Sequence, residues 1–209
     1  TKQKLTIALI ILTTIPFGLF AKLPQSWSFA SENLPSIAAF FSSFTGYLGL
    51  GLLLWMYILG TRSVTGLYFR DLAWTLRVHN WLGKYGMVAV FIHPLAASYY
   101  YGEKLFVYSF LPKISTEFEK HVTLGRLAFF GLLLVWFTSA IIKGKIKYRP
   151  WKYLHYIAYI VLPLTLLHTK EIGSSLNKPF ILFFYVCVVV TFIIFYNLKI
   201  LRTKFLRLE

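Results

Sequence analysis

Six long apolar segments occupy most of the chain and constrain its fold more than any other feature. A helix needs about 20 mostly apolar residues to cross the hydrocarbon core of a bilayer. The segments cover residues 4–22, 36–60, 74–101, 121–143, 150–169 and 179–201. Of the 209 residues, 57% are hydrophobic, which exceeds the share in an ordinary soluble domain. We therefore predict an all-α membrane protein, a six-transmembrane-helix bundle that forms one domain over residues 1–209.

The basic residues are placed as in a membrane protein rather than a nucleic-acid-binding protein, although the formal net charge is +15. They concentrate before the first segment, between segments two and three, between segments four and five, and after the sixth. The alternate connections are sparse or mixed in charge. Because cytoplasmic loops are enriched in Lys and Arg, we predict a multi-pass protein of the cell membrane with both termini in the cytoplasm and no nucleic-acid partner.

The first segment begins with basic residues and ends its apolar run at Ala21, as a signal peptide does. It is long for a signal peptide and lacks a small-x-small cleavage site, so we expect a retained helix. Cys187, in the sixth segment, is the single cysteine. An intramolecular disulfide and covalent haem attachment through C-x-x-C-H are therefore excluded within this sequence.

Four of the five histidines form two pairs inside the apolar segments, where ionisable side chains are costly and usually functional. His79 and His93 lie in the third segment, and His155 and His168 lie in the fifth. With the N-terminus in the cytoplasm, both segments run outward. At 1.5 Å per residue, the steps of 14 and 13 residues are about 21 and 19.5 Å long. His79 is therefore expected to face His155 near the inner side, and His93 to face His168 near the outer side.

Each histidine pair matches the needs of one haem iron. Histidine is the commonest metal ligand and an established axial ligand of haem, and facing helices of a bundle are a usual place for such a cofactor. We predict two stacked haem b groups, the inner one on His79 and His155 and the outer one on His93 and His168. His121, at the outer start of the fourth segment, is interpreted as an interfacial residue, with a role beside the outer haem as the alternative.

Helical periodicity agrees with this pairing in one segment and not in the other. At about 100° per residue, 14 steps bring His93 to within about 40° of His79, whereas 13 steps leave His168 about 140° from His155. Pro163 lies between the latter two, and proline kinks or rewinds a helix by removing a hydrogen bond. We therefore predict an irregular helix around Pro163.

Haem propionates require cations or water, because burying an unpaired charge is costly. Arg126, on the outer part of the fourth segment, is our candidate partner for an outer-haem propionate. Arg77 and Lys84 flank His79 and are candidates for the inner haem. The alternative for these two side chains is extension to the cytoplasmic headgroups.

Three glycines of the second segment, Gly46, Gly49 and Gly51, superficially suggest a nucleotide-binding loop. Their order does not fit G-x-G-x-x-G, and no strand is predicted before them. We interpret them as sites of close helix packing.

The stretches around the histidines resemble the ferric reductase-like transmembrane domain that ferric reductases and NADPH oxidases share. The resemblance rests on LRVHNWLGKYGMVAVFIHP (76–94) and LGRLAFFGLLLVWFTSAIIKGKIKYRPWKYLHYIAYIVLPLTLLH (124–168), which contain H-x13-H and H-x12-H. Trp151 before His155 and the Thr138-Ser139 pair also match the family pattern.

The resemblance implies transmembrane electron transfer by an NAD(P)H-dependent oxidoreductase. In this family a cytosolic FAD, reduced by NADPH or NADH, passes single electrons through the inner and outer haems to ferric iron or oxygen outside. The dehydrogenase domain normally follows the sixth helix, and no flavin or nucleotide motif precedes Glu209. The flavin and the nucleotide are therefore expected on a dehydrogenase domain or partner subunit outside this sequence.

A near relative offers an alternative function. The haem-binding membrane subunit of the bacterial methionine sulfoxide reductase system is similar in length, has six spans and works without a fused dehydrogenase, feeding a separate periplasmic protein. It commonly lacks a histidine at the position of His79, so the resemblance favours the reductase and oxidase branch.

A transporter or channel that uses the histidines for protons or metal ions is a further alternative. Such proteins more often carry carboxylates within their spans. Here the seven acidic residues lie in or near predicted loops or at the C-terminus, which disfavours this class.

Overall fold

The computed structural model describes residues 2–20, 34–61, 65–66, 68–69, 71–102 and 111–172, and their regular structure is helical. The elements are α1 (Lys2–Phe20), α2 (Leu34–Gly60), α4 (Leu72–Tyr100), α5 (Glu117–Phe137), the π-helical turn η3 (Thr138–Ile142), α6 (Tyr148–His155) and α7 (Ala158–Ile172). They correspond to the first five predicted segments, so the predicted all-α class is confirmed. The predicted sixth segment, 179–201, and Cys187 lie outside the described residues.

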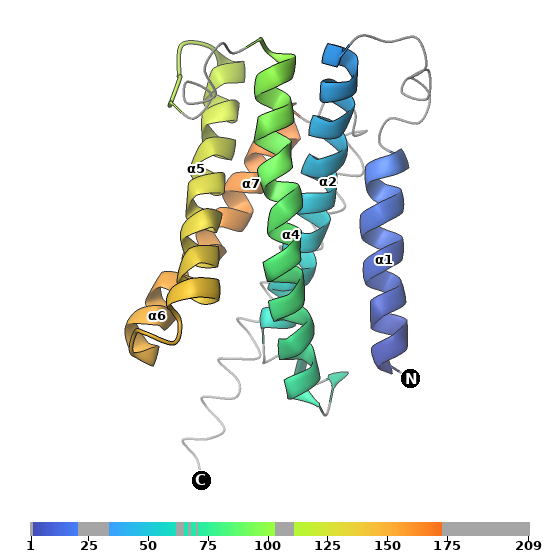
Figure 1. Cartoon of the computed structure of the whole chain (residues 1–209), viewed down its shortest axis with the longest axis vertical. Helices are drawn as coiled ribbons and strands as arrows, with labels where there is room; N and C mark the ends of the chain where they lie inside the picture. Colours follow the sequence, from blue (N-terminus) through green and yellow to red (C-terminus); the bar gives the residue numbers. More distant parts are fainter. Residues whose placement is uncertain are drawn as a thin grey trace, which may run out of the picture.

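The long helices stand side by side and alternate in direction along the chain (Figure 1). α1 and α4 pack against α2, and α5 packs against α7, so the site lies between two antiparallel helix pairs, α2–α4 and α5–α7. α4 and α7 run in the same direction (Figure 1). The predicted pairing of His79 with His155 and of His93 with His168 requires this parallel arrangement, because the first histidine of each segment must lie at the same depth.

Helix α5 is apolar on both its inward and its outward face. Its buried residues include Ala128, Leu132 and Val135, while large apolar side chains such as Leu127 and Phe130 are exposed. A helix that is hydrophobic all round belongs either in a large core or in a membrane. Within the described residues, two helices are long and apolar enough to cross a bilayer by length and composition, Ile37–Gly60 and Glu117–Ile142. The six-span count stays a prediction.

The N-terminal end of α5 is held by a capping box. Thr116 accepts a hydrogen bond from the amide of Glu119, and the Glu119 carboxylate accepts one from the amide of Thr116. Such a box satisfies two amides that a helix start would otherwise leave unpaired. The Thr123 hydroxyl adds hydrogen bonds of 3.0 Å from the Lys113 amide and 2.6 Å to the Lys113 carbonyl. α5 therefore begins four residues before the predicted start at residue 121.

The fifth segment is irregular, but the irregularity lies at residues 156–157 and not at Pro163, where we expected it. Pro163 lies inside the continuous helix α7. Amides that donate to the carbonyl three residues back, as in a 3₁₀-helix, belong to Tyr156, Ile157, Tyr159 and Ile160. The Tyr156 amide also donates to the Lys152 carbonyl, four residues back. A 3₁₀ step turns the chain by about 120° and raises it by about 2.0 Å.

These tighter steps bring His155 and His168 onto one face. Four 3₁₀ steps and nine α-helical steps turn the chain by about 1,380°, which is within about 60° of whole turns. The same 13 steps rise by about 21.5 Å, close to the roughly 21 Å that separates His79 from His93 on a regular helix. The 13-residue spacing in one segment therefore matches the 14-residue spacing in the other.

Candidate functional site

The structure brings the four membrane-segment histidines together in two pairs. The ring centroids of His79 and His155 are 6.1 Å apart, with an angle of 66° between the ring planes. The ring centroids of His93 and His168 are also 6.1 Å apart, with an angle of 77°. These are the two pairs expected from depth alone.

A separation of 6.1 Å is close to the distance at which two imidazoles can hold one metal ion between them. A metal–imidazole nitrogen bond is about 2.0–2.1 Å long, and the ring centre lies about 1.1 Å behind that nitrogen, so the two centroids stand about 6.2–6.4 Å apart. The same separation recurs at both levels, between the histidines whose depths in the sequence match. Both pairs therefore have the spacing of opposed axial ligands.

Three of the four imidazoles donate their Nδ1 proton to a backbone carbonyl. The acceptors are the Met56 carbonyl for His79 at 2.8 Å, the Ser42 carbonyl for His93 at 2.7 Å, and the His121 carbonyl for His168 at 2.9 Å. A carbonyl oxygen only accepts, so Nδ1 carries the proton and the lone pair lies on Nε2. This is the tautomer in which Nε2 binds a metal and a second group orients the ring.

The fourth imidazole, His155, has different neighbours. Its Nδ1 lies 3.1 Å from the hydroxyl oxygen of Ser139 in η3. The Trp151 ring stacks on the imidazole with centroids 5.1 Å apart and 25° between the planes. Lys143 lies over the Trp151 ring, with its Nζ 4.8 Å from the ring centroid. Trp151 was singled out in the sequence only as part of a family pattern, and the structure places it against a predicted ligand.

Glycines on the neighbouring helices make room for three of the imidazoles. A Cβ added at Gly46 would lie 2.8 Å from His93 Nδ1, and one at Gly125 would lie 2.5 Å from His168 Nδ1. A Cβ at Gly60 would lie 3.0 Å from His79 Cε1. The close packing predicted for Gly46 is confirmed, but its histidine neighbour was not predicted from the sequence, and neither were the roles of Gly60 and Gly125. A detectable signal was the 14-residue spacing of Gly46 and Gly60, which repeats that of His79 and His93.

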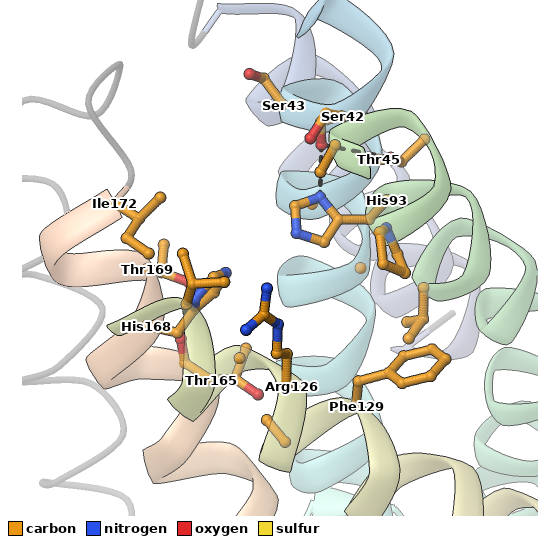
Figure 2. Close-up of a pocket in the computed structure, with 18 of the residues that line it drawn as sticks. Ser42, Ser43, Thr45, His93, Arg126, Phe129, Thr165, His168, Thr169 and Ile172 are labelled. Atoms are coloured by element: carbon orange, nitrogen blue, oxygen red, sulfur yellow. Dashed lines mark hydrogen bonds between the residues drawn. The ribbon is translucent and has the colours of Figure 1, made fainter. Parts of the chain in front are cut away.

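A cavity of about 580 Å³ lies at the outer pair, within the size range of cofactor sites. His93 and His168 lie on opposite sides of it, and the Arg126 side chain reaches into it from α5 (Figure 2). Arg126 Nη1 donates a hydrogen bond to the Leu111 carbonyl. The predicted propionate partner therefore lines the same cavity as the two outer histidines.

The two cations predicted for the inner pair lie elsewhere on α4. Arg77 is exposed and forms an ion pair with Asp71, with nitrogen and oxygen 3.7 Å apart. Lys84 is also exposed, with its Nζ 5.2 Å from the Tyr85 ring centroid. Positions two before and five after His79 lie about 140–160° around the helix from it. The structure therefore does not bring either cation to the imidazole.

Comparison with protein families identifies the kind of protein to which this site belongs. The family model described as "Ferric reductase like transmembrane component" matches residues 45–166, which is more than half of the chain. The chain belongs to this family. The match covers His79, His93 and His155 and ends two residues before His168. No curated protein and no solved structure matches the chain.

Membership in the ferric reductase-like family identifies an integral membrane protein and an oxidoreductase component. Haem, which the sequence predicts, is the group to test against the site. In the part of the chain that the structure describes, no group of three or more His, Cys, Asp or Glu side chains is placed to hold a metal ion. Each level offers two imidazoles, which is the number of axial positions that a porphyrin leaves on its iron. The residues of this ferric reductase-like component therefore fit haem.

Proposed function

We propose that this ferric reductase-like component carries electrons across the bilayer through two b haems, each held by two histidines. The observation that carries the proposal is the repeated 6.1 Å centroid separation, at His79–His155 and at His93–His168. The two levels lie about 21 Å apart along α4, so together they span most of a hydrocarbon core about 30 Å thick. When bound, haem iron supplies reversible one-electron chemistry.

The chain's own contribution is to orient the ligands and to exclude water between the two levels. Backbone carbonyls and the Ser139 hydroxyl hold the Nδ1 side of the four rings, which would leave Nε2 to bind the iron. Midway between the levels, all four site helices contribute apolar side chains to one buried cluster, which includes Leu53, Met87, Leu132 and Leu162. This layer keeps the surroundings of the two sites dry and of low dielectric, which is one way in which a protein sets reduction potentials.

Arg126 is proposed to bind a propionate of the outer haem, because its side chain enters the cavity between the outer histidines. The carboxylate and guanidinium would then form a charge-assisted pair where burying either charge alone is costly.

We propose that the electrons originate from cytosolic NAD(P)H through an FAD-containing dehydrogenase domain or partner, and that the acceptor outside is ferric iron or oxygen. The family membership supports this direction, as does the basic connection between the fourth and fifth segments, with Lys143, Lys145 and Lys147 exposed near the inner pair.

Haem content of histidine variants tests the proposed function. The purified wild-type protein is expected to hold two haems per chain, and His93→Ala or His168→Ala is expected to lose the outer haem and keep the inner one. His79→Ala or His155→Ala is expected to do the reverse, because each iron would lose one of its two ligands. Pyridine-haemochrome assay and the Soret absorbance give the stoichiometry.

His121→Ala is the matched control, because the structure uses the backbone carbonyl of His121 and not its ring to orient His168. It should retain both haems. Absence of any Soret band from wild-type protein after haem supplementation would contradict the proposal, and so would His93→Ala protein with two haems.

A further inference from the structure

Three of the four predicted ligands share one structural motif, which we call the glycine notch. In each notch, the imidazole lies against a glycine and donates Nδ1–H to the carbonyl four residues before that glycine. The glycine and carbonyl residues are Gly46 with Ser42, Gly60 with Met56, and Gly125 with His121. In a regular helix this carbonyl already accepts the amide proton of the glycine, so the notch uses its second lone pair.

Two of the glycine notches are 14 residues apart on one helix, and the same interval on the other helix predicts the position of a fourth notch. On α2, Gly46 and Gly60 are 14 residues apart. On the other helix, the residue 14 after Gly125 is Ser139. Ser139 faces the remaining ligand, His155. Ser139 therefore occupies, beside His155, the position that a glycine occupies beside each of the other three histidines.

The serine changes the atom that accepts the imidazole proton. The carbonyl four residues before Ser139 is that of Val135, and it accepts a hydrogen bond from the Thr138 hydroxyl at 3.1 Å. The helix widens at this point into the π-helical turn η3, which starts at Thr138. His155 Nδ1 instead meets the Ser139 hydroxyl oxygen at 3.1 Å. π-helical turns often mark functional positions in helices.

We propose that Ser139 is a positioning residue that raises the reduction potential of the inner haem, an inference that rests on the proposed function. The partner of Nδ1–H tunes the basicity of the ligating imidazole. An amide carbonyl is a better acceptor than an aliphatic hydroxyl, so it leaves more electron density on the imidazole and favours ferric iron. His155 donates to the weaker acceptor and stabilises the ferric state less.

The effect falls on one haem alone. Both ligands of the outer haem donate to carbonyls, whereas the inner haem has one carbonyl-bound and one hydroxyl-bound imidazole. Ser139 thus makes the Nδ1 partners of the two haem sites unequal in acceptor strength.

Potentiometric titration of the full chain in lipid nanodiscs, followed at the haem absorption bands, tests this inference. Ser139→Gly should lower the inner potential, because a restored notch lets His155 approach the Val135 carbonyl. Ser139→Ala should raise it, because the methyl group blocks that approach and offers no acceptor. Ser139→Thr keeps a hydroxyl and should stay near the wild-type value. The outer haem of the same molecules is the internal control and should not shift.

Opposite shifts in the glycine and alanine variants are the decisive result, since loosened packing alone would move both in the same direction. An unchanged inner potential in both variants, shifts of the same sign, or loss of the inner haem from all three variants would overturn the inference. Each of these results would leave the proposed function standing, because wild-type protein would still bind two haems. Wild-type protein without haem would instead end the proposed function.

Discussion

An imidazole that binds a metal through one ring nitrogen needs a hydrogen-bond partner for the other, and the four site histidines find theirs in different ways. His79, His93 and His168 use backbone carbonyls, while His155 uses a side-chain hydroxyl. A carbonyl is present at every residue, so it leaves no trace in the sequence. The glycine that exposes it does leave a trace, because only a residue without a side chain lets the ring approach so closely.

Alanine at a glycine notch is expected to displace the ligand. Gly125→Ala would place a methyl group 2.5 Å from His168 Nδ1, and Gly46→Ala would place one 2.8 Å from His93 Nδ1. Overpacking of this kind costs about 1–3 kcal/mol, so both variants should lose most of the outer haem and keep the inner one. Haem stoichiometry after purification measures the loss.

Gly144→Ala is the control, because Gly144 follows η3 and does not line the outer cavity. Its added Cβ would have no atom within 4 Å. We expect this variant to hold two haems. Equal haem content in the Gly144, Gly46 and Gly125 variants would show that the notches do not constrain the ligands.

Among the elements, the α6–α7 connection decides whether the fifth segment presents both of its histidines to the site. The 3₁₀-type bonds around residues 156–157 supply the extra turn and rise that a 13-residue spacing lacks. Sequence periodicity indicated that an irregularity was needed but assigned it to Pro163. Proline lacks the amide that an α-helix uses, yet α7 continues through Pro163 because one missing hydrogen bond need not break a packed helix.

Two variants of the fifth segment test whether its irregularity lies at residues 156–157 or at Pro163. Insertion of one alanine between Tyr156 and Ile157 should rotate His168 by about 100° relative to His155, and so should remove one of the two haems. Pro163→Ala should keep both haems, with a Tm equal to or above that of the wild type, because the Tyr159 carbonyl gains a donor. Absorbance spectra and thermal unfolding in detergent give these quantities. A proline variant without one haem would restore Pro163 as the source of the irregularity.

At the scale of the whole molecule, two antiparallel helix pairs face each other and place two ligand levels one above the other. Glycines lie behind both outer imidazoles and behind one of the two inner ones. The space between the two levels is filled mainly with aliphatic side chains. Large apolar side chains also cover the outside, including Phe41, Trp81, Val88, Leu134 and Ile160. Lipid is the environment in which this surface is stable.

Cysteine labelling in intact cells tests the predicted orientation in the membrane. In a Cys187→Ser background, a membrane-impermeant maleimide should label Ser115→Cys, near the outer pair, and should not label Lys145→Cys, near the inner pair. Both variants should react after the cells are broken. The reverse labelling pattern would contradict a cytoplasmic N-terminus and would exchange the names inner and outer.

The amino-acid sequence by itself determined the helical class, the identity of the four half-buried histidines and their pairing, because apolar length and depth along parallel helices are properties of a linear pattern. It also placed Arg126 at the depth of the outer pair. Only the tertiary structure decided which groups orient the imidazoles, that Arg77 pairs with Asp71, and where the fifth segment tightens. These features depend on which backbone atoms of different helices approach one another, and a carbonyl or a helical turn acquires its role only through such contacts.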